Sequence, residues 1–182
     1  MPFAFIALLL SAGAVAGSFY LSLEMNLKAC ALCFYQRAFA CGLVGVLATG
    51  VLAFRDQGAK LCKVALPLAI AGLGVAGFHV WLGWTAWPRQ DAAWYLACPA
   101  GIEGIGTAPQ QSLAVFGAIT LVLFVGAIGE VGASGRGGAA LIGGLILGAA
   151  GAVGSILANP PMPDPKPLAA DQTLVTCQPT TR

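Results

Sequence analysis

PFAFIALLLSAGAVAGSFYLSL, residues 2–23, is an apolar stretch without a single charged residue. A helix needs about 20 mostly apolar residues to cross roughly 30 Å of hydrocarbon, so this stretch predicts a membrane-spanning helix. Residues 1–10 lack the positively charged segment that opens a secretory signal peptide, and the apolar run continues beyond the length of a signal-peptide core. We therefore expect it to be retained as a first span.

Similar apolar stretches follow along the chain, at residues 34–54, 64–84, 113–129 and 138–158. The composition agrees with them, because 58% of the residues are hydrophobic and only 9% are charged, whereas about a quarter of a soluble domain is charged. The expected fold is all-α, a polytopic membrane bundle of five spans. The net charge of +2 is small and no basic stripe is interleaved with aromatic residues, so no nucleic-acid partner is expected.

Successive spans cross the membrane in opposite directions, so the connecting segments alternate between its two faces. The first connection, the third connection and the C-terminal tail then share one face, which brings together Cys30, Cys33, Cys98 and Cys177. The other face carries Arg136 and a short connection, residues 55–63, with three basic residues. Basic residues in short connections favour the cytoplasm. We predict that the four cysteines lie on the opposite side, where Trp81 and Trp84 suit the interface.

Cys30-Ala31-Leu32-Cys33 is a C-x-x-C pair at the mouth of the second span. The thiolate is the reactive form of cysteine, and a helix N-terminus or a nearby cation favours it. This position favours a redox pair, although a disulfide that only staples the connection has the same spacing. A structural zinc site needs four cysteine or histidine ligands. No second pair is present and His79, the one histidine, lies in the third span, so no metal is expected.

Arg37 lies four residues beyond Cys33, about one helical turn deeper in the span. A charge there is costly and marks a functional site, unless the side chain reaches up to the headgroups. Both interpretations fit the spacing. In the functional one, the guanidinium donates hydrogen bonds to the carbonyl oxygens of a flat lipophilic acceptor such as a quinone.

The run Cys30-Ala31-Leu32-Cys33-Phe34-Tyr35-Gln36-Arg37 resembles the C-x-L-C-x-x-Q/E-R motif of the disulfide-bond formation protein B (DsbB) family. The resemblance extends to the short first loop, the basic second loop and the long third loop, and so covers residues 1–130. It implies a bacterial inner-membrane enzyme, a protein-disulfide:quinone oxidoreductase with periplasmic cysteines. Such an enzyme reoxidises a periplasmic thioredoxin-fold, DsbA-like partner and passes the electrons to ubiquinone or menaquinone.

By motif position, the resemblance makes Cys33 the quinone-proximal thiolate, Arg37 the quinone ligand and Cys30 the thiol that exchanges with a second cysteine pair. His79 is similar to a family histidine that could hydrogen-bond the quinone or supply a proton. A hydrogen bond between helices is an equally good interpretation of His79. Cys41 and Cys62 are predicted to be packing residues.

The sequence departs from the family after residue 130. DsbB proteins resemble four-span bundles with both partner-facing cysteines in the second periplasmic loop, where this chain has only Cys98. Residues 131–158 add a fifth span, and the Pro-rich tail, residues 159–182, returns Cys177 to the same face. Our hypothesis is that Cys98 pairs with Cys177; the alternative is that both are separate thiols.

Two other functions remain open. One is a thiol and quinone enzyme of the vitamin K epoxide reductase type, although the C-x-x-C of that type lies in a late span. The other is a non-enzymatic membrane assembly factor whose cysteines form structural disulfides.

Overall fold

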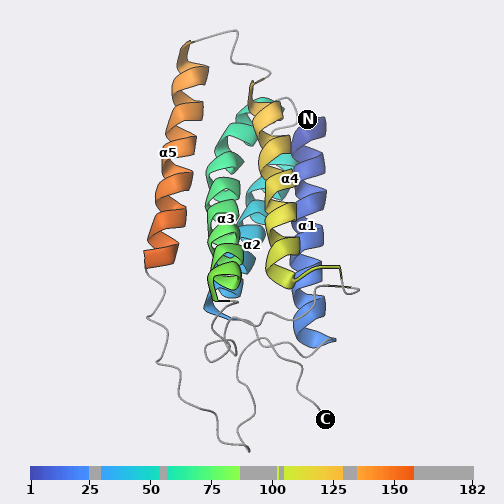
Figure 1. Ribbon diagram of the computed structural model, residues 1–182. Helices are drawn as coiled ribbons and strands as arrows, with labels where there is room; N and C mark the ends of the chain where they lie inside the picture. The colour runs from blue at the N-terminus through green and yellow to red at the C-terminus, as the bar shows by residue number, and fades with distance from the viewer. Residues whose placement is uncertain (25–29, 54–56, 87–101, 103–104, 129–134, 158–182) are drawn as a thin grey trace, which may run out of the picture.

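Five α-helices run alternately up and down through the structure, a computed structural model that describes residues 1–24, 30–53, 57–86, 102, 105–128 and 135–157 (Figure 1). These helices are α1 (Pro2–Leu23), α2 (Ala31–Ala53), α3 (Gly58–Ala86), α4 (Ala108–Ile128) and α5 (Gly135–Leu157). The described residues contain no β-strand. The all-α fold expected from the sequence is therefore confirmed.

Helix α3 is the centre of the bundle, because it packs against each of the other four helices. The core contains Leu43 and Leu47 from α2, Leu66 from α3, and Phe116 and Ile119 from α4. All five are almost completely shielded from solvent. The position of α3 means that any group on its inward face can meet residues from several helices.

Helices α1 to α4 are each long and apolar enough to cross a membrane. Their outward faces carry large apolar side chains, among them Phe5 and Leu9 on α1 and Leu121 on α4. A soluble monomer rarely exposes apolar patches this extensive. The bilayer, rather than water, is the solvent that such faces require, so the chain is a multi-pass membrane protein.

Helix α5 has 23 residues, a length of about 34 Å at 1.5 Å per residue. It packs along α3, where Gly148 lies against Ile70 and the carbonyl oxygen of Pro67. Within the described part of α5, residues Leu145–Ser155 form an apolar segment that is shorter than a span. The fifth crossing of the membrane therefore remains a prediction.

The two ends of the bundle differ in composition. Cys30 precedes α2 at the end where α1 and α3 finish and α4 begins (Figure 1), and α3 exposes Trp81 and Trp84 there. Lys60 and Lys63 lie at the opposite end, at the start of α3. Successive connections between the helices therefore lie at opposite ends of the bundle, as the sequence predicts.

Candidate functional site

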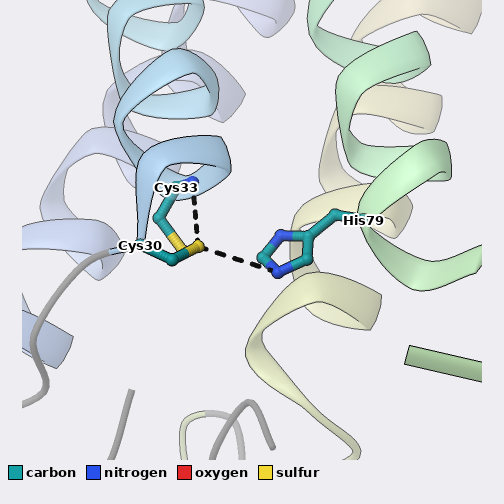
Figure 2. A group of neighbouring side chains, drawn as sticks. All are labelled: Cys30, Cys33 and His79. Atoms are coloured by element: carbon teal, nitrogen blue, oxygen red, sulfur yellow. Dashed lines mark hydrogen bonds between the residues drawn. The ribbon is translucent and has the colours of Figure 1, made fainter. Parts of the chain in front are cut away.

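Cys30 and Cys33 lie at the N-terminal end of α2, with their Sγ atoms 2.7 Å apart (Figure 2). Cys30 directly precedes Ala31, the first residue of the helix, and its sulfur accepts a hydrogen bond from the backbone N–H of Cys33 at 3.3 Å. Ser, Thr, Asp or Asn usually fills this capping position. Here a sulfur takes that role, so the partial positive charge of the helix N-terminus favours the thiolate of Cys30.

His79 reaches the cysteine pair from α3 (Figure 2). Its ring is buried, and Nε2 lies 3.7 Å from the Sγ atom of Cys30. On the other side of the ring, Nδ1 lies 3.3 Å from Nε2 of Gln36, a buried residue of α2. With the amide nitrogen of Gln36 donating to Nδ1, a neutral ring carries its proton on Nε2, directed at the sulfur.

Arg37 is held by helix α1 through three hydrogen bonds. Nε donates to Oγ of Ser18 at 2.8 Å, and Nη2 donates to the Ser18 carbonyl oxygen at 3.0 Å and to Oγ of Ser22 at 2.7 Å. The guanidinium also lies over the rings of Phe19 and Phe34, at 4.9 and 5.8 Å from their centroids. Nη1 makes no hydrogen bond to any described residue, so it remains a donor for another group.

A cavity of about 590 Å³ lies between α1, α2 and α4. Its polar lining includes Cys33, Gln36 and Arg37, and most of the remaining lining is apolar. Ile102 also lines the cavity and lies against Gly17 of α1. Gln111 of α4 fixes this residue, because its side chain hydrogen-bonds both the N–H and the carbonyl of Ile102 at 3.0 Å. His79 is not one of the described residues that line the cavity.

From the predicted site, the structure brings His79 to Cys30 and Cys33 and places Cys33 and Arg37 on one cavity. Cys98 and Cys177 lie outside the described residues, as does any pairing between them. Cys62 is buried in the core, as its packing role predicts, whereas Cys41 is exposed on the surface of α2. Cys41 is therefore not packed inside the described part of the bundle.

Gln36, Ser18 and Ser22 were not assigned roles from the sequence. Each is a polar residue within an apolar helix, where an unpartnered hydrogen-bonding group is costly. That cost is a usable signal, because it predicts that each such residue has a partner. It does not say which partner, since that depends on how the helices face one another.

Comparison with known families and proteins agrees with this geometry. Residues 2–114 match the family described as "Disulfide bond formation protein DsbB". The match includes the cysteine pair, Arg37 and His79, ends within α4 and does not reach α5.

Among curated proteins, a "Probable disulfide formation protein" of Chlamydia trachomatis is 32% identical over 121 residues, which is 65% of this chain and 87% of the relative. Similarly named proteins are 32% identical in Chlamydia pneumoniae, over 62% of this chain and 81% of the relative, and in Chlamydia caviae, over 66% and 88%. No solved structure matches the chain significantly.

Proposed function

Because the chain belongs to the DsbB family, we propose that it is a disulfide-forming thiol oxidase of a bacterial inner membrane. In this proposal it reoxidises a periplasmic thioredoxin-fold, DsbA-like protein and passes the electrons to membrane quinone, ubiquinone or menaquinone. The observation that carries the proposal is that Cys33 and Arg37 line one cavity while Cys30, the partner of Cys33, lies at the end of the bundle.

The cavity suits a quinone ring by its size and its lining. Ligand pockets of this kind have volumes of about 300–1,000 Å³ and are mostly apolar with a few placed polar groups. Arg37 would hold a ring carbonyl through Nη1, because Nε and Nη2 are already bonded to α1. A bound quinone supplies an acceptor for two electrons and two protons.

The cysteines divide the exchange chemistry between them. In the proposed cycle a reduced partner first opens the disulfide between Cys98 and Cys177, and the reduced outer pair then attacks Cys30. The bond between Cys30 and Cys33 breaks, Cys33 leaves as a thiolate, and a mixed disulfide forms between the outer pair and Cys30. The second outer cysteine then attacks the outer sulfur of that mixed disulfide, which restores the Cys98–Cys177 bond and releases Cys30. Restoring the bond between Cys30 and Cys33 would remove two electrons and two protons from the dithiol, and a quinone held by Arg37 would supply the acceptor that balances the cycle.

His79 and Gln36 would act on Cys30 rather than on the quinone. When Cys30 is released as a thiolate, the backbone N–H of Cys33 and Nε2–H of His79 are donors from the described residues that face its sulfur. Gln36 holds the ring so that this proton lies on Nε2. We assign Gln36 as a positioning residue, because it touches His79 and not the sulfur.

The proposed orientation puts the cysteine pair on the periplasmic side. Lys60 and Lys63 lie at the other end of the bundle, and Arg136 lies in the first turn of α5, which begins at that end (Figure 1). Clustered basic residues in short connections are retained in the cytoplasm. The exposed Trp81 and Trp84 would then lie at the outer interface, where tryptophan is enriched.

The test is quinone reduction by the purified full-length protein in lipid nanodiscs, with a reduced thioredoxin-fold protein as electron donor. Cys30→Ser and Cys33→Ser should abolish turnover. Arg37→Lys should raise the KM for quinone about tenfold, since it keeps the positive charge but loses the planar set of guanidinium N–H donors. Cys41→Ser, on the exposed face of the same helix, is the matched control and should retain full turnover.

Quinone turnover that survives Cys33→Ser would overturn the proposal. If the chain were instead a non-enzymatic assembly factor, even the wild-type protein would reduce no quinone. Its disulfides would also stay intact when the reduced partner is added.

A further inference from the structure

Three atoms that can ligate a metal ion lie close together at the N-terminal end of α2. Sγ of Cys30, Sγ of Cys33 and Nε2 of His79 all lie within 4.8 Å of one another. They come from two helices far apart in sequence, and Figure 2 shows the imidazole edge directed at the two sulfurs. The sequence places His79 in the third span, and the fold brings its Nε2 to 3.7 Å from the Sγ atom of Cys30.

The spacing of these atoms is close to that of a tetrahedral zinc site. Zn–S bonds of about 2.3 Å and Zn–N bonds of about 2.0–2.1 Å place neighbouring ligand atoms about 3.6–3.8 Å apart. Sγ of Cys30 and Nε2 of His79 are already 3.7 Å apart. The two sulfurs, at 2.7 Å, need to separate by about 1 Å, which rotation of one cysteine side chain provides.

The charges also balance at this site. Two thiolates cancel the charge of one divalent cation, and the imidazole ligand is neutral, so the occupied site has no net charge at the edge of an apolar bundle. Thiolate and imidazole together select thiophilic cations such as zinc and cadmium. Three protein ligands leave the fourth position to water. Binding replaces two S–H protons with one cation.

Gln36 can hold the His79 ring both when a metal is bound to it and when the site is metal-free. A metal on Nε2 requires the ring proton on Nδ1, so Gln36 must then present its amide oxygen instead of its nitrogen. Rotation of the amide by half a turn does this without moving α2 or α3. Partners of this kind on a ligating histidine typically contribute about 10–100-fold to metal affinity.

We propose that the reduced form of this site binds one zinc-like divalent cation through Cys30, Cys33 and His79, and that the disulfide form does not. Metal binding and formation of the Cys30–Cys33 bond exclude each other, because a sulfur in a disulfide is no longer a thiolate. The cation therefore arrests the pair in its reduced state until a chelator removes it. This property goes beyond the proposed oxidase function and holds whatever the electron acceptor is.

The experiment titrates cadmium into the full-length protein in nanodiscs under anaerobic conditions. The protein is first reduced, and the excess reductant is removed before the titration. A Cys98→Ser, Cys177→Ser background removes competing thiols, and thiolate-to-cadmium absorption in the ultraviolet is the readout. We expect one cadmium ion per chain, with the absorption intensity of two thiolates, and displacement by zinc. His79→Ala should weaken the affinity at least about tenfold, and Cys41→Ser should leave it unchanged.

The same protein with the Cys30–Cys33 disulfide formed is the second arm, and it needs no substitution that might disturb the fold of the site. We expect it to show no cadmium absorption band from these thiols. Equal affinity in the disulfide form, an unchanged band in Cys30→Ser, or unchanged affinity in His79→Ala would each overturn the proposed site.

Discussion

Gln36 is the residue whose role depends most on the folded structure. It is buried on α2 and contacts Nδ1 of His79. Gln36→Leu removes the partner that fixes the ring, so the donor facing Cys30 is no longer oriented. We expect the rate of thiol oxidation to fall about tenfold, less than the roughly 10²–10⁴-fold of a proton-transfer group itself, because Gln36 acts through His79. Stopped-flow quinone reduction with single turnover of the enzyme measures it.

Gln36→Glu is the informative control for that prediction. A carboxylate can only accept a hydrogen bond, so it takes the ring proton onto Nδ1 and leaves Nε2 of a neutral ring without a proton for Cys30. The ring stays oriented, yet the rate should fall at least as far as in Gln36→Leu. The KM for quinone should change little in Gln36→Leu if the residue acts through His79. A rate retained in Gln36→Glu would contradict a role through the Nε2 proton, and a loss confined to KM would show that Gln36 acts on the cavity it also lines.

Arg37 depends on two serines of α1 for its position. Ser18→Ala together with Ser22→Ala removes two side-chain acceptors, at 2.8 and 2.7 Å, and leaves the Ser18 carbonyl as the remaining bond. The guanidinium should then move out of register with the cavity. We expect the KM for quinone to rise about tenfold, near the lower end of what one hydrogen bond to a charged group contributes.

The matched control for the serine variant is Ser11→Ala on the same helix. Among the described residues, Ser11 bonds the carbonyl of Ala7 alone, in its own helix, so its loss should leave KM unchanged. A KM that is unaffected by loss of Ser18 and Ser22 would mean that the rings of Phe19 and Phe34 suffice to hold Arg37.

At the level of helices, the sequence predicts that a helix exists better than it predicts the residues at which the helix begins and ends. The first helix has its predicted bounds, Pro2–Leu23, whereas α2 begins at Ala31 and α4 at Ala108, several residues before the predicted spans. Hydropathy marks where a helix enters the hydrocarbon, not where its hydrogen bonds begin. The difference matters at α2, because the extra turn makes Cys30 the capping residue and brings Cys33 into the helix.

In the candidate site, some residues were predictable from the sequence, but their contacts with other helices were not. Cys30, Cys33 and Arg37 were predictable because one helical stretch carries them in fixed order. The contacts of Cys30 with His79, 49 residues away, and of Arg37 with Ser18, 19 residues away, were not. Those contacts depend on the rotation of α1 and α3 about their axes, which composition and period leave open when nearly every face is apolar.

Packing of α5 against α3 depends on a glycine. A Cβ atom on Gly148 would lie 2.7 Å from Cβ of Ile70 and 2.8 Å from the carbonyl oxygen of Pro67, and both neighbours are too constrained to yield. Gly148→Leu should therefore separate the two helices at a cost of about 1–3 kcal/mol. Thermal unfolding in detergent should show a lower Tm for this variant.

Gly154→Leu on the same helix is the control, since a Cβ atom there meets nothing within 4 Å. We expect the Tm of this variant to equal that of the wild type or exceed it, because leucine favours helix over glycine. Equal losses in the two variants would mean that the close approach at Gly148 does not hold α5 in place.

For the whole molecule, the alternation of helices fixes which groups share a side of the membrane. Cys30 and Gln57 lie at opposite ends of α2 and its connection to α3 (Figure 1). A chain that keeps Cys30 as its one cysteine should react with a membrane-impermeant maleimide from the periplasm, since Cys30 is only partly buried. A chain with Gln57→Cys as its one cysteine should react only after the inner membrane is opened.

This pair of labelling experiments tests orientation independently of catalysis, because neither chain needs a disulfide to be labelled. Gln57 is exposed, so a failure to label it in opened membranes would indicate misfolding, and that chain's expression would be checked by labelling in denaturant. The reverse pattern, with Gln57→Cys labelled from outside and Cys30 protected until the membrane is opened, would place the cysteine pair in the reducing cytoplasm. Disulfides seldom persist there, so that orientation would remove the oxidase function even if every contact within the bundle is as described.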